Sequence, residues 1–315
     1  MKAVLLHEYG GPENLRYEED VPEPALSADS VLVEAAATSV NPVDWKIRSG
    51  ARQKDFPLQL PAILGRDVSG IVRAVGDNIR TFKPGERVLA YATHTYAELV
   101  AVAGSTLTHL PAGLDLVDSA AIPLIALTGE QLVRLAARAQ PGQTVLVSGA
   151  LGSVGRAAVH AARKLGATVI AGVRARQLPQ AGTLGVSGTV AIDDDSAIAG
   201  LAKVDCVADT VGGETAAKLF ATVKDGGNFG YASVLPDGVQ QRNLTVTITR
   251  VFAHPDASKV REFADDIRDG KFVLPISQRL PLREAGKAHA LAQQGGAGKI
   301  VLVCQAHGAP GVAIS

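Results

Sequence analysis

The sequence has few cysteines and no excess of charge of either sign. Its 315 residues contain only two cysteines, Cys206 and Cys304, which lie far apart and outside any CxxC pattern. A disulfide framework and a structural zinc site built from four cysteines are therefore not expected. Lys and Arg total 31, as do Asp and Glu. The overall charge thus favours neither a nucleic acid nor an anionic membrane as a partner.

Long apolar runs are missing as well. No stretch reaches the roughly 18 apolar residues of a membrane-spanning helix. The apolar run in the opening MKAVLLHEYG is too short for a secretory signal. We therefore expect a cytoplasmic protein. The length predicts two domains, since one domain typically takes about 100–200 residues.

The pattern of apolar segments divides the chain into three parts. Residues 1–122 hold short β-like runs flanked by Gly and Pro, which predicts a largely antiparallel β domain. In residues 123–252 apolar strands alternate with helical segments, which is typical of a parallel sheet covered on both faces. Residues 253–315 contain two helical segments and a last strand. The simplest architecture is α/β, a Rossmann doubly wound parallel sheet inserted in a β-rich domain.

A glycine-rich turn between a strand and a helix is the most informative motif. Residues 145–167 read VLVSGALGSVGRAAVHAARKLGA, a GxGxxG pattern with Ala in the first place. Gly152 would let the backbone approach a pyrophosphate, and Gly155 would let the helix pack on the strand. The amides of Gly152, Ser153 and Val154 would face the phosphates. The alternative is a packing turn that binds nothing. The expected cofactor contacts here are Ala150, Leu151, Gly152, Ser153 and Val154.

The end of the next strand predicts the type of cofactor. NAD-binding domains carry an acidic residue there, which holds the ribose 2′-hydroxyl. This strand ends in VRARQ, with Arg174 and Arg176 and no carboxylate. A guanidinium suits a 2′-phosphate because it donates two parallel hydrogen bonds. We therefore predict NADPH; the alternative is that both arginines belong to a solvated strand end.

Ligands of such sheets lie beyond the carboxyl ends of the strands. That rule predicts cofactor contacts after two later strands. Val211 is expected on the adenosine side. The ribose and nicotinamide are expected near Gly230, Tyr231 and Ala232.

Four motifs occur in an order that resembles a known family. They are NPVDWKIRSG (residues 41–50), GRDVSGIVRAVG (65–76), LTG (127–129) and GKIVL (298–302). Together they resemble the medium-chain dehydrogenase/reductase superfamily, specifically its zinc-independent quinone oxidoreductase branch. The resemblance covers about residues 1–304 and implies that the β-rich domain is GroES-like.

The resemblance also implies roles for single residues. Asn41 and Pro42 would line the nicotinamide and substrate pocket, and Thr128 and Phe252 would face the nicotinamide. Arg66 stands where zinc alcohol dehydrogenases carry a histidine ligand, and residues 40–44 contain no cysteine. A guanidinium cannot bind zinc, so no metal is expected. Relatives usually dimerise through the last strand of the Rossmann sheet, here residues 243–249.

Reduction without zinc needs a group that stabilises the negative oxygen formed on the substrate. The candidate catalytic residues are Asn41, Lys46, Arg52 and Tyr96. Lys46 and Arg52 could equally be solvated, and Tyr96 could serve only in packing.

The two carboxylates of these motifs are expected to have a structural role and not a catalytic one. Asp44 and Asp67 are expected to bond backbone amides, or Arg66 and Arg48.

These observations predict an NADPH-dependent, zinc-free reductase of a quinone or an α,β-unsaturated carbonyl compound. The substrate would be a small electrophile. Because only 4% of residues are aromatic, an enone is at least as plausible as a flat quinone. Two alternatives remain open: an enoyl-thioester reductase of the polyketide type, and a non-catalytic NADPH-binding redox sensor.

Overall fold

The computed structural model describes residues 1–296 and 298–304, and the chain forms two compact units. The terminal unit comprises Met1–Leu124 together with the described residues from Pro255 onward. The central unit comprises Ile125–His254. Residues 305–315, the end of the third predicted segment, lie outside the described residues.

The terminal unit is rich in short strands, as the sequence predicted. Three form a small sheet in the order β2-β1-β4, and the others form a larger sheet in the order β15-β16-β3-β5-β6-β8, with β7 also paired to β3. All pairs are antiparallel except β15 with β16. The strands are β1 (Ala3–Leu6), β2 (Leu15–Glu18), β3 (Ser30–Val40), β4 (Ala62–Ile63), β5 (Asp67–Val75), β6 (Arg87–Tyr91), β7 (Leu99–Ala103), β8 (Leu107–His109), β15 (Ile276–Pro281) and β16 (Lys299–Val303).

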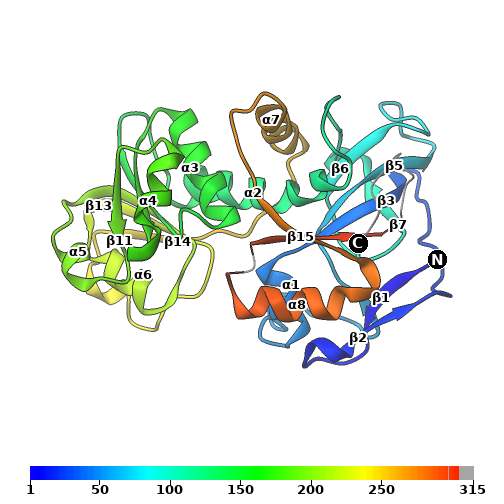
Figure 1. Cartoon of the computed structure of the whole chain (residues 1–315), viewed down its shortest axis with the longest axis horizontal. Helices are drawn as coiled ribbons and strands as arrows, with labels where there is room; N and C mark the ends of the chain where they lie inside the picture. Colours follow the sequence, from blue (N-terminus) through cyan, green and yellow to red (C-terminus); the bar gives the residue numbers. More distant parts are fainter. Residues whose placement is uncertain (297, 305–315) are drawn as a thin grey trace. The chain divides into compact units, whose positions relative to one another are not determined.

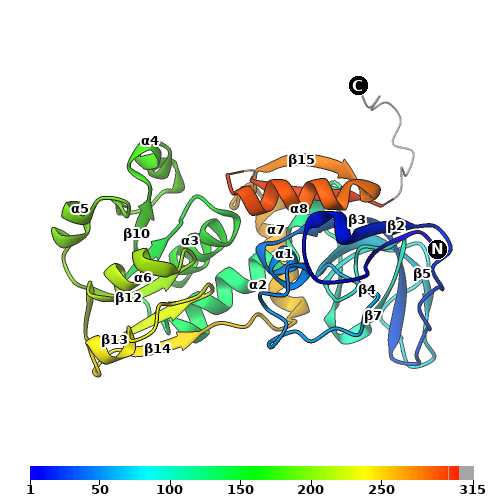
Figure 2. The same cartoon turned by 90° about the horizontal axis from the view of Figure 1, so that it is seen from below.

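Strand β16 joins the two ends of the chain within this unit. It pairs antiparallel with β3, with Ile300 opposite Val40. That register places the start of β16 beside the start of α1 (Pro42–Arg48), the first helix after β3. Helix α8 (Ala285–Gln294) packs against α1 and the 3₁₀ turn Pro12–Asn14, and Figure 2 shows it along the outside of the strands. The remaining helix of the unit is α7 (Ala257–Arg268).

The central unit is a six-stranded parallel sheet in the order β11-β10-β9-β12-β13-β14. In chain order this reads 3-2-1-4-5-6, the doubly wound order of dinucleotide-binding domains. Figure 1 labels β11, β13 and β14 of this sheet. The strands are β9 (Thr144–Ser148), β10 (Thr168–Val173), β11 (Gly188–Ala191), β12 (Val204–Asp209), β13 (Val223–Tyr231) and β14 (Thr247–Arg250). The helices are α2 (Pro123–Gln131), which continues into a π-helical turn (Leu132–Ala136), α3 (Ser153–Leu165), α4 (Leu178–Ala181), α5 (Asp195–Ala199) and α6 (Gly213–Phe220).

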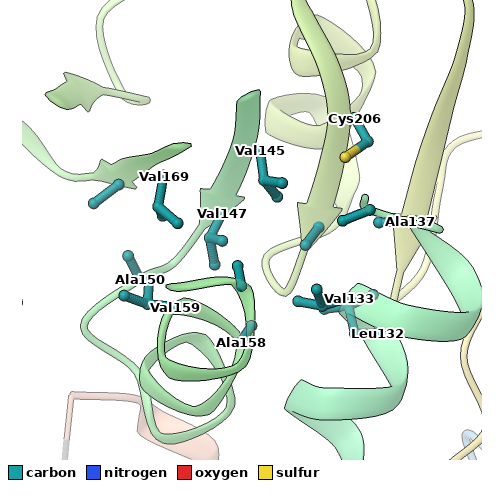
Figure 3. Close-up of a cluster of buried hydrophobic side chains, with 14 of the residues drawn as sticks. Leu132, Val133, Ala137, Val145, Val147, Ala150, Ala158, Val159, Val169 and Cys206 are labelled. Atoms are coloured by element: carbon teal, nitrogen blue, oxygen red, sulfur yellow. The ribbon is translucent and has the colours of Figure 1, made fainter. Parts of the chain in front are cut away.

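Alternating side chains of the central strands supply two cores. Val145 and Val147 of β9 face α3 and the end of α2, whereas Leu146 between them faces α5 and α6. Figure 3 shows the first core, with Cys206 of β12 among its labelled side chains. Burial raises the pKa of the Cys206 thiol to about 12. Cys206 is fully buried in this core.

One predicted strand is shorter than expected. Residues 243–249 were predicted to be extended, but β14 begins only at Thr247. The Asn243 side chain accepts hydrogen bonds from the backbone and hydroxyl of Thr245, at 2.9 and 2.7 Å. Such local bonds compete with strand pairing. Among the described helices, none is long and apolar enough to cross a bilayer.

Candidate functional site

The glycine-rich turn lies where β9 ends and α3 begins. Gly152 is the residue before the first turn of α3. A Cβ on Gly155 would lie 2.0 Å from the carbonyl oxygen of Gly149. The helix can therefore approach the turn this closely only because Gly155 has no side chain.

One expected phosphate donor of this turn is already bonded. The Gly152 amide donates to the Gly149 carbonyl at 2.8 Å, and its contact with a phosphate stays a prediction. The Ser153 and Val154 amides bond no group in the part of the chain that the structure describes. They remain as donors at the positive end of the α3 dipole, which suits an anion. Arg156, in the first turn of α3, adds a cation that the sequence analysis missed.

Arg174 and Arg176 follow β10 directly and are exposed. No ion pair to either guanidinium occurs among residues 1–296 and 298–304. The residues directly after β10 include no carboxylate, but Asp193, just after β11, reaches this strand end from the neighbouring strand. Its Oδ1 accepts a hydrogen bond from the Ala175 amide at 2.7 Å. The turn therefore combines two cations with one carboxylate that is tied to the backbone.

The ends of β12 and β13 hold further expected contacts. Val211 follows β12 and is 42% exposed. The buried Asp209 organises this turn, because its carboxylate accepts hydrogen bonds from Ser148 and the Gly212 amide at 2.5 and 2.8 Å. A Cβ on Gly230 would lie 2.5 Å from the Ala137 amide nitrogen, so close packing by itself accounts for that glycine.

The other predicted contacts of the central unit stay near these strand ends. Tyr231 ends β13 and Ala232 follows it, both half-buried. Phe252, just beyond β14, is 52% exposed and has the Arg250 guanidinium 4.7 Å from its ring centroid. Thr128 lies on α2.

In the terminal unit, Asn41 is the hub of a buried polar network. Its Nδ2 donates to Asp67 Oδ2 at 2.7 Å, and its Oδ1 accepts from Lys299 Nζ at 2.7 Å. Ser39 also donates to Asp67 Oδ2. Both polar atoms of the Asn41 amide are thus occupied. Pro42, the first residue of α1, is exposed.

Lys299 is a buried cation for which the sequence predicted no functional role. Its Nζ lies 3.6 Å from Asp67 Oδ2, and both side chains are almost fully buried. Burial lowers the pKa of Lys299, while Asp67 and Asp44 act against that effect. No local pattern could reveal this contact, because Lys299 and Asn41 are 258 positions apart and meet through the pairing of β16 with β3.

Tyr96 is fully buried and belongs to a second polar cluster. Its hydroxyl lies 2.9 Å from His289 Nε2 and 3.3 Å from Asp44 Oδ2. Asp44 Oδ2 also accepts the Asn41 amide at 2.8 Å. Burial raises the pKa of Asp44 to about 6 and lowers that of His289 to about 3.

The sequence did hold a signal for His289. It lies one turn after Ala285 on α8, on the face that Ala285 and Ala288 bury.

Both motif carboxylates bond backbone amides, as expected. Asp44 accepts from Asn41, and Asp67 Oδ1 accepts from the Leu124 amide at 2.7 Å. The alternative partners were wrong, since Arg66 instead donates to Tyr91 and Arg48 to Gln293.

The two remaining catalytic candidates lie together near the end of α1. The Arg52 amide bonds the Lys46 carbonyl at 3.2 Å. Arg52 Nε lies 2.7 Å from Asp55 Oδ2, and Lys46 Nζ lies 5.5 Å from the Trp45 ring centroid. Burial lowers the pKa of Lys46, with a smaller effect of Arg52 in the same direction.

Two of the cavities in the described chain lie each within a single unit. One of about 440 Å³ lies in the central unit between α5 and α6. Lys203 and Thr222 line it just before β12 and β13, which is the edge of the sheet opposite to the glycine-rich turn. The other, of about 60 Å³, lies in the terminal unit beside Asp44 and Arg66. Within residues 1–296 and 298–304, no three His, Cys, Asp or Glu side chains gather as metal ligands.

Family models match two parts of the chain. The model of the alcohol dehydrogenase GroES-like domain matches residues 27–112, and that of zinc-binding dehydrogenases matches residues 187–302. A quinone oxidoreductase of Pseudomonas aeruginosa is 34% identical over 96% of this chain and 99% of that protein. The quinone oxidoreductase of Mus musculus is 40% identical over 172 residues, 54% of this chain and 51% of that protein. The match thus spans about half the length of the mammalian relative.

Solved structures agree with the sequence relatives. The quinone oxidoreductase from Coxiella burnetii superposes with a TM-score of 0.85 at 26% identity, over 97% of this chain and 99% of that one. A mycobacterial protein complexed with NADPH gives a TM-score of 0.80 at 25% identity, over 96% and 100% of the two chains. The nearly full-length match at 34% identity, with the doubly wound sheet and the GroES-like unit, confirms the family that the motifs predicted. The chain belongs to the quinone oxidoreductase branch of the medium-chain dehydrogenase/reductase superfamily and has a nicotinamide-dinucleotide-binding fold.

Proposed function

We propose that this protein is an oxidoreductase that uses NADPH, without a metal, to reduce a quinone or an α,β-unsaturated carbonyl compound. The main support is the carboxyl edge of the central sheet. There the Ser153 and Val154 amides lack partners among the described residues, and Arg174 and Arg176 have no ion pair. One edge thus offers donors for a pyrophosphate and cations for a further phosphate.

The bound dinucleotide supplies the hydride, so the residues of this chain position it, exclude water and stabilise charge. The turn before α3 fits the pyrophosphate, because the Gly152 backbone is exposed and two helix amides have no acceptor in the described chain. Thr128, Val211, Tyr231, Ala232 and Phe252 are proposed to contact the rest of the cofactor. Asn41 and Pro42 are proposed to contact its nicotinamide.

The choice of NADPH over NADH depends on the turn after β10. Two exposed guanidiniums can pair with a 2′-phosphate. Asp193 opposes them, but the Ala175 amide already occupies its Oδ1. The balance at the turn is therefore positive and favours the phosphate-bearing dinucleotide.

The absence of a metal from the reaction is argued from residue chemistry. Arg66 stands where zinc dehydrogenases carry a histidine ligand, and a guanidinium offers no lone pair to zinc. Stoichiometric zinc in the purified, active protein would contradict this part of the proposal.

The first experiment follows the loss of NADPH absorbance with a panel of electrophiles. The panel contains 1,4-benzoquinone, 9,10-phenanthrenequinone, 2-cyclohexenone, trans-2-hexenal and crotonyl-CoA, each with NADPH and with NADH. Turnover of a quinone or an enone, faster with NADPH, is expected. Preference for crotonyl-CoA would favour the enoyl-thioester reductase. NADPH binding without any turnover would favour the redox sensor.

Variants at the turn after β10 test the cofactor preference. Replacing Arg174 and Arg176 together by Ala should raise KM for NADPH about 10- to 100-fold, because the charge-assisted bonds lost with the two side chains are together worth roughly 1.5–3 kcal/mol. KM for NADH should change little. Asp193→Asn keeps an acceptor for the Ala175 amide but removes the charge, so it should lower KM for NADPH. Arg16→Ala, an exposed arginine of β2, is the control; equal effects on both cofactors would contradict the assignment.

We further propose that two copies of the chain associate through β14. It is the last strand in the sheet order, and an unpaired strand edge is a ready template for another strand. Leu244, three residues before β14, is 81% exposed. An exposed leucine beside a strand edge fits burial against a second copy.

A further inference from the structure

The cavity of about 60 Å³ in the terminal unit is lined by residues of α1, of β4 and of the loops that follow α1, β4 and β6. Its size suits a head group of a few atoms. The residues that line it are Asp44, Ile47, Leu58, Ile63, Leu64, Gly65, Arg66, Thr93 and His94. His94 has a φ of 60°, a conformation that costs non-glycine residues about 1–3 kcal/mol and that clusters at functional sites.

Arg66 presents a positioned cation to this cavity. Its Nη1 donates to the Tyr91 hydroxyl at 2.9 Å, and its guanidinium carbon lies 4.4 Å from the Phe56 ring centroid. Arginine carries five N–H donors, and the Tyr91 hydroxyl takes only one of them. No carboxylate lies within ion-pair distance of Arg66 in the described chain. The hydrogen bond and the ring fix the guanidinium while most of its donors stay available.

Asp44 supplies the complementary group. It is 1% exposed, and its Oδ1 has no hydrogen-bond partner among the described residues. A buried polar atom left without a partner costs about 1–3 kcal/mol. A ligand oxygen that first carries negative charge and then a proton could use both the Arg66 donors and this acceptor.

The four residues expected to stabilise a substrate oxyanion are less suited to that role. The Asn41 amide is occupied at both ends, and Tyr96 is fully buried among its own partners. Arg52 lies against Asp55 at 2.7 Å. Lys46 is not among the residues that line the cavity. Of the cationic side chains of the terminal unit, Arg66 alone lines this cavity.

We propose that Arg66 binds the carbonyl oxygen of the substrate in this cavity and stabilises the enolate formed during reduction. This inference rests on the proposed function and selects α,β-unsaturated carbonyl compounds as its substrate class. NADPH would supply the hydride and be left as NADP⁺. The hydride forms a bond to the β carbon, and the π pair of the C=C bond moves into the bond between the α and carbonyl carbons. The carbonyl π pair moves to the oxygen, where negative charge collects beside the guanidinium. Water then donates a proton to this oxygen, and the enol hydroxyl so formed can donate to Asp44 Oδ1. The enol gains a proton from water at the α carbon as its hydroxyl proton is lost to water, which restores the carbonyl.

The kinetic test uses two substitutions of Arg66 with 2-cyclohexenone and NADPH. Arg66→Met should lower kcat about 100-fold or more, as loss of an oxyanion donor typically does, and leave KM for NADPH unchanged. Arg66→Lys keeps the charge but not the planar fork and should recover part of kcat. Arg73→Met, an exposed arginine of the neighbouring β5, should behave as the wild type. Wild-type kcat in Arg66→Met would overturn the proposal.

A binding test needs no cofactor and so separates this inference from the proposed function. Trp45, the one tryptophan of the chain, adjoins Asp44, and its fluorescence should respond to a ligand in the cavity. Crotonate, an unsaturated carboxylate, should change the emission saturably in the wild type and in Arg73→Met, but not in Arg66→Met. Far-UV circular dichroism confirms that the variants are folded.

The kinetic test and the binding test can refute the proposed function and the anion site separately. If no enone is turned over but crotonate binding depends on Arg66, the proposed function fails and the anion site stands. If enones are turned over and crotonate binds Arg66→Met as it binds the wild type, the anion site is overturned.

Discussion

At the scale of single residues, His289 and Asp44 give opposite contributions to stability as the pH changes. Burial lowers the pKa of His289 from about 6.5 to about 3. The unfolded chain therefore binds the extra proton, and this contribution to stability is lost as the pH falls from about 6.5 to 3, by at most ~5 kcal/mol. Burial raises the pKa of Asp44 to about 6. The folded state then binds the extra proton, so this contribution is lost as the pH rises from about 4 to 6.

We predict that His289→Gln removes the first of these contributions. The free energy of unfolding of the variant, relative to the wild type, should rise as the pH falls from about 6.5 toward 3. Near neutral pH the variant should be less stable by about 1 kcal/mol, because a buried hydrogen bond to Tyr96 is weakened. Urea unfolding at several pH values measures the difference. A flat result for His289→Gln would refute a buried neutral imidazole.

Lys299 allows a second prediction at this scale. Replacement by Met leaves the Asn41 Oδ1 without a donor and Asp67 without a cation, so the free energy of unfolding should fall by about 3–5 kcal/mol. Lys287→Met, which removes an exposed pair with Glu284, should cost at most about 1 kcal/mol. If the pair is coupled, Asp67→Asn combined with Lys299→Met should destabilise less than the sum of the single changes. Additive effects would show that Lys299 is not coupled to Asp67.

At the scale of elements, the junction of β9 and α3 depends on one missing side chain. In Gly155→Ala the new Cβ would meet the Gly149 carbonyl at 2.0 Å. We predict a loss of about 1–3 kcal/mol in stability and weaker NADPH binding, because the turn must open. Gly182→Ala is the matched control in the same unit, with an ordinary helical φ of −58° and no atom within 4 Å of the new Cβ. Unfolding in urea and NADPH fluorescence titration measure both effects, and unchanged binding in Gly155→Ala would count against this turn as the phosphate site.

The predicted strands agree with the structure where the pattern of apolar residues along the chain is enough to define a strand. The apolar runs in 144–148 and 204–209 were enough to predict β9 and β12, since each strand is buried on both faces. Pattern was insufficient for residues 243–246, where the Asn243 side chain bonds Thr245 in place of a neighbouring strand. Short strands such as β4 have too few residues for any period to be seen.

At the scale of the whole molecule, the proposed association through β14 predicts a dimer. Light scattering after gel filtration should give twice the chain mass of 32.5 kDa. Leu244→Glu should shift the protein toward monomer, because a charge would be buried at the interface. Val273→Glu, at a site 64% exposed in the terminal unit, should leave the dimer intact. A wild-type monomer at micromolar concentration would contradict the proposal.

The sequence alone determined the fold class, the family and the place of the glycine-rich turn. Each depends on a motif of consecutive residues or on the regular spacing of apolar residues. Tertiary structure decided which side chains meet. Asp193 reaches the turn after β10 from a neighbouring strand, and Lys299 reaches Asn41 from the other end of the chain. It also decided which candidates are already engaged, such as Asn41 and Tyr96, and that Arg66 lines a cavity. Burial and hydrogen-bond partners depend on residues distant in sequence, and a local pattern carries no information about them.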